Sequence, residues 1–151
     1  MTLPQAQGRI TLIEALTLLV ALVVVTAVAI PLWRSHEFQS RRADAREALE
    51  ALRKAQDDYF GRHARYADRG QVHAAPPLGL GLLRRSPHGH FDIDVEGDAD
   101  GLGYVATARG ITLPDKRADT RCAEFRMDQQ GRRTAESAEG KDTTADCWND
   151  L

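Results

Sequence analysis

The hydrophobic residues of this chain are concentrated in one segment near its N-terminus. Between Ile10 and Trp33 the single charged residue is Glu14, and the run from Ala15 to Leu32 contains none. These 24 residues would span about 36 Å as a helix, more than a hydrocarbon core of about 30 Å. A secretory signal peptide has a shorter apolar run, so the pattern predicts a transmembrane helix over residues 10–33.

The helical pattern continues beyond the apolar segment. Small and apolar side chains recur at helical spacing on one downstream face, at Ala45, Leu49, Leu52 and Tyr59, with Ala48 and Ala55 beside them. Charged residues occupy the other faces of this stretch. The two halves predict one helix of about 50 residues, kinked at Pro31 because proline interrupts the hydrogen-bond ladder. Its apolar stripe must pack on another element.

The C-terminal half predicts a small antiparallel sheet. Residues 70–88 are rich in glycine and proline and predict a loop. We expect its leucines, Leu78, Leu80, Leu82 and Leu83, to pack down onto the fold. Residues 90–96 alternate apolar and polar, a turn follows at 97–101, and further strands are predicted at 103–109, 121–128 and 132–136. One long helix covered by such a sheet gives an α+β fold.

Length and charge restrict the function. The 151 residues allow one domain, and 20 basic against 22 acidic residues give a net charge of -2. That balance argues against a dedicated nucleic-acid binder, so we expect no nucleic-acid partner. The mean hydropathy of -0.42 is an average over one apolar segment and a polar remainder. This division of the chain excludes a simple cytosolic globule and a multi-span transporter.

Motifs that suggest chemistry are weak. They are the adjacent Ser35 and His36, the pair His88 and His90, the acidic turn with Glu96, Asp98 and Asp100, and the basic pairs Arg84–Arg85 and Arg132–Arg133. None has the further residues that a catalytic triad, a metal site, a calcium loop or a phosphate-binding stripe requires. We therefore predict no catalytic residue, no metal site, no cofactor and no enzyme activity.

The N-terminal segment resembles a known family. The sequence ITLIEALTLLVALVVVTAVAIP, in which Glu14 and Pro31 are 17 residues apart, is similar to the start of type IV pilins and pseudopilins. The C-terminal ending, with Cys122, Cys147 and Trp148, resembles PilE-like minor pilins. The resemblance implies the type IV pilin fold: a long kinked helix, a small antiparallel sheet and a C-terminal loop closed by a disulfide.

The resemblance also implies a function and an organisation. Residues 1–9 would be a leader removed by a prepilin peptidase, 10–33 a transmembrane half-helix, and 34–151 the pilin head. Other pilin subunits would be the partners, and Glu14 would pair with the N-terminal amine of an adjacent subunit. The expected function is a minor pilin for adhesion, twitching motility or pilus biogenesis. The alternatives are a type II secretion pseudopilin, a single-pass periplasmic binding module and a DNA-binding uptake pilin.

The leader departs from the family pattern. Alignment of TLIE makes Ile10 the first mature residue and places Arg9 where the family has glycine, while Gly8 lies one position earlier. Three outcomes follow for processing: cleavage after Gly8, cleavage after Arg9, or none.

The two cysteines bear on localisation. Cys122 and Cys147 are 25 residues apart and would be free thiols in a cytosolic protein, but an upstream membrane segment favours a disulfide in an oxidising compartment. The basic residues that follow the apolar segment favour a cytoplasmic C-terminus by the positive-inside rule. The cysteines and the resemblance favour the opposite orientation, and we expect an inner-membrane anchor with a periplasmic C-terminus, followed by a place in the pilus.

Overall fold

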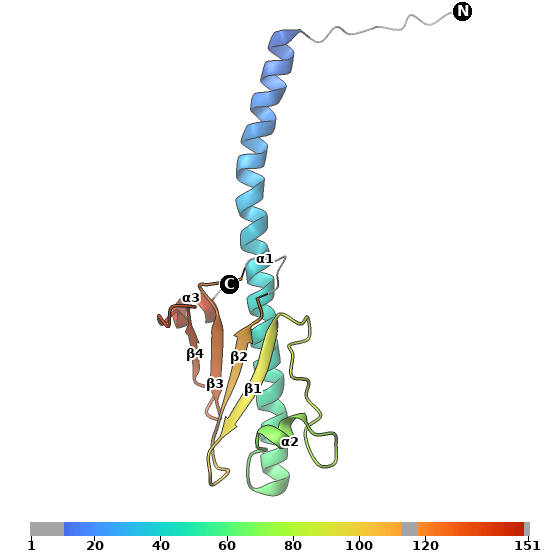
Figure 1. The fold of residues 1–151 in the computed structure, drawn as a ribbon, viewed down its shortest axis with the longest axis vertical. Coiled ribbons are helices and arrows are strands. Elements are labelled where there is room, and N and C mark those ends of the chain that lie inside the picture. Colours follow the sequence, from blue (N-terminus) through green and yellow to red (C-terminus); the bar gives the residue numbers. More distant parts are fainter. Residues whose placement is uncertain (1–10, 113–117, 150–151) are drawn as a thin grey trace, which may run out of the picture. The chain divides into compact units, whose positions relative to one another are not determined.

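A computed structural model describes residues 11–112 and 118–149 of the chain (Figure 1). The expected leader, with Gly8, Arg9 and Ile10, lies outside the described residues. The chain divides into two compact units between Glu37 and Phe38. All of the buried core residues lie between positions 45 and 147, in the second unit, which we call the head.

Helix α1, Leu12–His63, is the predicted long helix, and its assignment passes through Pro31 without a break. Its 52 residues match the predicted length of about 50, and Arg62 and His63 lie in the last turn, where positive charge interacts favourably with the helix dipole. The kink at Pro31 stays a prediction. In the head, the predicted stripe of Ala45, Leu49, Leu52 and Tyr59 is buried.

Four antiparallel strands form a sheet in the order β1-β2-β3-β4. Their bounds are β1 Phe91–Gly97, β2 Tyr104–Gly110, β3 Glu124–Asp128 and β4 Arg133–Glu136. Each predicted strand exists, although the third begins three residues later than expected. The predicted α+β architecture is therefore confirmed.

The core forms where the sheet covers the stripe of α1. Alternate strand residues face the helix, among them Phe91, Ile93, Val95, Ala106, Ala108, Phe125 and Met127. Phe91 and Phe125 meet edge to face at 5.6 Å. Period-two burial on the strands and helical periodicity on α1 thus produce one apolar layer between them.

The connection between α1 and β1 is more ordered than a loop. It contains helix α2, Arg69–His73, which begins with a capping box between Asp68 and Gln71. The chain then runs beside α2, with Leu80 N–H donating to Gln71 O at 2.9 Å and Leu82 N–H to Val72 O at 3.0 Å. Gly79 fits here because a Cβ at this position would lie 2.0 Å from the Gln71 carbonyl oxygen.

This arrangement corrects one expectation. Leu80 and Leu82 pack against the core, but Leu78 and Leu83 are 78% and 75% exposed. The expectation that all four leucines pack down was therefore wrong for two of them. Hydrogen bonding to α2 turns residues 80 and 82 inward, which leaves the other two side chains outside.

Both edges of the sheet are closed by the chain itself. Beside β1, Ile93 N–H donates to Arg84 O and Ser86 N–H to Phe91 O. Beside β4, Thr143 N–H donates to Ala135 O, and Ala135 N–H donates to the Thr144 hydroxyl. Thr144 begins a helix absent from the sequence prediction, α3 Thr144–Trp148. Closed edges disfavour the addition of a foreign strand.

Candidate functional site

The first candidate site is the start of α1, where Thr11 and Glu14 form a capping box. Thr11 donates to Glu14 Oε2 from its backbone N–H at 2.8 Å and from its hydroxyl at 3.0 Å, and Glu14 N–H donates back to Thr11 Oγ1 at 3.3 Å. The sequence offers Glu14 no charged partner at Thr17 or Leu18. The structure supplies an uncharged partner on the N-terminal side, through the signature S/T-x-x-E, which the sequence already contained.

The segment that follows is an exposed apolar helix. Leu12–Ile30 has a mean hydropathy of 2.6 and is long and apolar enough to cross a membrane. Within the described part of the chain, none of it is buried. Its hydroxyl groups are satisfied locally, since Thr17 donates to Glu14 O and Thr26 to Leu22 O. Such internal satisfaction suits a helix surrounded by lipid or by other apolar helices.

The predicted disulfide is present in the head. Cys122 and Cys147 are bonded, with their Cα atoms 5.8 Å apart and both side chains buried. Close to it, Asp119 accepts from Arg42 Nε at 2.7 Å and from the backbone N–H of Cys122 at 3.2 Å. The bond joins α3 to the chain just before β3, and the ion pair joins that stretch to Arg42 on α1.

The backbone N–H groups of His88 and His90 are bonded to a buried carboxylate. Asp44 on α1 is 2% exposed and accepts from the Ser86 hydroxyl at 2.6 Å and from the backbone N–H groups of His88 and His90 at 3.0 and 3.3 Å. The hydrophobic pattern did not predict that Asp44 is buried, although its place four residues before Ala48 puts it on the buried face of α1. Asp44 fixes the last turn before β1.

A second buried polar residue on α1 was also missed. Gln56 is fully buried, donates from Nε2 to Ala67 O at 2.9 Å and accepts from Ala67 N–H at 2.8 Å. The neighbouring Ala55, which the sequence placed beside the apolar stripe, is only half-buried. This pair of bonds holds the chain where it turns away from the end of α1.

The outer face of the sheet is a network of ion pairs. Glu124 accepts from Arg109 at 2.8 Å and from Arg126, and Arg126 also contacts Glu136 at 3.0 Å. Burial raises the pKa of Glu124, but the two guanidinium bonds outweigh it and hold that pKa below its usual range. Among the described residues, no group of three or more His, Cys, Asp or Glu side chains could hold a metal ion.

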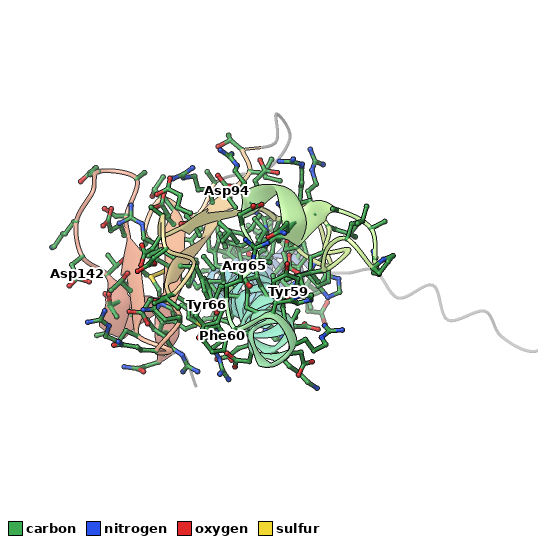
Figure 2. All side chains as sticks on the ribbon, turned by 90° about the horizontal axis from the view of Figure 1, so that it is seen from below. Tyr59, Phe60, Arg65, Tyr66, Asp94 and Asp142 are labelled. Carbon is green, nitrogen blue, oxygen red and sulfur yellow. A yellow bond between two sulfur atoms is a disulfide. The ribbon has the colours of Figure 1, made fainter. Side chains whose placement is uncertain are left out.

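The far end of α1 combines basic and aromatic side chains, among which Tyr59, Phe60, Arg65 and Tyr66 are labelled in Figure 2. Arg62, His63 and Arg65 are exposed there. The Phe60 and Tyr66 rings lie 4.6 Å apart, and Tyr66 meets Tyr104 edge to face at 4.9 Å. Burial, followed by the charge of Asp57, raises the pKa of both tyrosines, so both rings stay neutral.

A hollow of about 410 Å³ adjoins this end of the head. One wall comes from residues 65–71 and the other from the β1–β2 turn, and Tyr66 N–H donates to Gly101 O at 2.8 Å between them. The turn side carries the predicted acidic residues Glu96, Asp98 and Asp100. The wall with Arg65 and Arg69 therefore faces a wall of opposite charge.

Comparison with known proteins gives the family. No curated protein matches the chain. A solved type IV pilin from Shewanella oneidensis is 21% identical and has a TM-score of 0.44, over 63% of this chain and 88% of that chain. A family model described as "Type IV minor pilin ComP, DNA uptake sequence receptor" matches residues 31–126, more than half of the chain. With its apolar helix, four-stranded sheet and disulfide, the chain belongs to the ComP family of type IV minor pilins, which assemble with other pilins in a pilus.

Proposed function

We propose that residues 10–33 hold this minor pilin in the inner membrane, with residues 34–151 in the periplasm, until the subunit enters the filament. The observation that carries this proposal is the apolar surface of Leu12–Ile30, none of which is buried among the residues that the structure describes. Such a surface is stable in lipid or among similar helices. Transfer from the membrane to a filament core therefore exchanges one apolar environment for another.

Within that core, Glu14 is proposed to pair with the N-terminal amine of an adjacent subunit. A carboxylate buried without a cation is strongly unfavourable, whereas a well-bonded pair compensates much of the desolvation. Before assembly, the capping box with Thr11 gives the carboxylate two uncharged donors. The same two bonds support a membrane-bound state before assembly, in which Glu14 lies at the beginning of the helix.

The substitution Glu14→Ala tests the assembly role. We expect membrane levels near those of the native protein, since a single lost helix cap costs about 1 kcal/mol, and at least about tenfold less incorporation into sheared filaments, as expected for loss of a buried ion pair. The matched control is Glu47→Ala, which removes an exposed carboxylate from the head portion of α1. Equal incorporation of the two variants would remove the assembly role, and so would the disappearance of Glu14→Ala from the membrane.

Processing of the leader requires its own measurement. We expect a prepilin peptidase to cut after Gly8, leaving Arg9 at the N-terminus and its guanidinium beside the new amine. The Arg9 guanidinium can pair with Glu14 of a neighbouring subunit and reaches farther than an amine. This reach offsets the shift of the N-terminus by one helical residue, about 1.5 Å along the helix axis and 100° around it. Intact-mass spectrometry in a peptidase-positive strain distinguishes the three outcomes.

A mass that still includes residues 1–8 would contradict incorporation into the filament. Arg9→Gly should move the cut to the bond before Ile10. If it does not, the alignment through Glu14 and Pro31 is wrong.

DNA binding is a second candidate function, favoured by the description of the family model. The basic and aromatic end of α1 supports it, because Arg62 and Arg65 can contact phosphates while Tyr66 offers a ring for contact with bases. The acidic β1–β2 turn and the net charge of -2 oppose it. If DNA binds, we expect it at this end of the head and not on the outer face of the sheet.

A gel-shift titration of the detergent-solubilised full chain with duplex DNA tests this candidate. We expect Arg62→Ala/Arg65→Ala to weaken binding and to reduce the salt slope by about 2. The control is Arg121→Ala/Arg132→Ala, which removes two arginines paired with Asp146 and Asp128. No shift with the native chain, or equal weakening by both variants, would contradict binding at this end.

A further inference from the structure

An apolar groove lies on the head beside the beginning of β1. Its volume is about 240 Å³, and Ala48, Leu52 and Ile93 form much of its floor. Leu82, Leu83 and Pro87 form one wall, and Arg85 lies at its rim. Leu83 is 75% exposed. Exposed apolar surface of this kind marks sites of association.

A complementary feature follows the end of β1. The β1–β2 turn exposes Leu102, which is 58% accessible, beside Asp98 and Asp100. The turn is held by bonds from Asp98 N–H to Gly103 O at 2.9 Å and from Leu102 N–H to the Asp100 carboxylate at 3.0 Å. A leucine on a fixed acidic turn loses little freedom when it enters a groove.

The charges of the two features are opposite. The groove segment 82–88 contains two arginines and no acid, whereas the segment 96–103 contains three acids and no base. Arg85 is only loosely paired, since its Nε lies 3.7 Å from Asp92 and both side chains are 64% exposed. Such an exposed pair is weak and leaves Arg85 available to a second acid.

The two features lie too far apart to meet within one subunit. Arg85 bridges to Asp92 near the start of β1, and the turn follows Gly97 at the other end of the strand, as Figure 1 shows. Seven strand residues span roughly 23 Å. Since both sheet edges are closed, association through side chains is favoured over strand addition.

We propose that the β1–β2 turn of one subunit docks, through Leu102, into the groove at Leu82, Leu83 and Arg85 of a second copy of this chain. The proposal rests on the proposed function, because it specifies contacts between heads in a pilus. Turn and groove are different surfaces, so the contact is heterologous: each pair leaves one free turn and one free groove. Such contacts propagate into rings or helical filaments.

Cross-linking between engineered cysteines tests the contact in membranes and in detergent extracts of the full chain. Leu83→Cys/Leu102→Cys is expected to give a ladder of covalent multimers on mild oxidation. The two single variants, expressed together, should give a dimer and nothing larger, and each alone should give monomer. Arg85→Glu should lower the yield by about fivefold at low salt, and Glu96→Arg in the same chain should restore it.

The control pair is Leu78→Cys/Leu102→Cys, because Leu78 is equally exposed but lies outside the groove. Absence of the ladder overturns the docking proposal, as does equal cross-linking of the control pair. A dimer from either single variant alone also overturns it, because that would show a two-fold contact. Incorporation of the native chain into sheared filaments is measured in parallel. Incorporation without a ladder contradicts the docking alone, whereas a native chain that never enters filaments contradicts the proposed function.

Discussion

Removal of the disulfide is expected to lower the unfolding free energy of the head by about 3 kcal/mol. Cys122 and Cys147 close a segment of 25 residues, and the chain-entropy model gives about that value for a loop of this length. Residues 129–146 of the enclosed segment are mostly polar, so the cross-link contributes much of their order. Cys147 also lies on α3, which closes the outer edge of β4.

Denaturant unfolding of residues 38–151 measures this loss, because every buried core residue lies within that unit. Cys122→Ala/Cys147→Ala should match the reduced native head and should not respond to a reducing agent. Hydrogen exchange at the Ala135 amide, which donates to the Thr144 hydroxyl at 2.9 Å, should accelerate. An unfolding transition that reduction leaves unchanged would show that the bond contributes little.

Loss of the Asp44 carboxylate is expected to destabilise the head by about 3 kcal/mol. Three donors converge on this 2% exposed side chain. Asp44→Ala leaves the Ser86 hydroxyl and the His88 N–H without this acceptor, while the His90 N–H keeps its bond to Ser86 Oγ at 3.1 Å. Each unsatisfied buried group costs about 1–3 kcal/mol, reduced where water can enter. We expect the turn at residues 86–90 to loosen and the start of β1 with it.

The matched control is Asp58→Ala, which removes an exposed carboxylate from the same helix and should change stability by about 0.5 kcal/mol or less. Asp44→Asn should give an intermediate loss, since its amide keeps one acceptor oxygen. Equal unfolding free energies for Asp44→Ala and Asp58→Ala would contradict the central role of Asp44.

Local patterns in the sequence were sufficient for the elements and for their layers. The apolar run that contains Glu14 predicted a membrane helix, and the recurrence of Leu49, Leu52 and Tyr59 predicted which face of α1 the sheet covers. Alternation at residues 90–96 predicted β1 with an error of one residue. These predictions depend on helix and strand periodicity, which the order of residues fixes directly. The pairing of Cys122 with Cys147 was also accessible, because the chain has two cysteines.

Tertiary structure decided which polar residues are buried and which leucines are not. Asp44 and Gln56 occupy positions that a hydrophobic pattern excludes, and they are tolerated because backbone groups more than ten residues away in sequence satisfy them. Leu78 and Leu83 face outward because the chain beside α2 turns Leu80 and Leu82 inward. The groove and the acidic turn acquire their separation from the length of β1. The buried polar residues, the exposed leucines and the groove all depend on where distant segments of the chain meet. Periodicity along the chain does not contain this information.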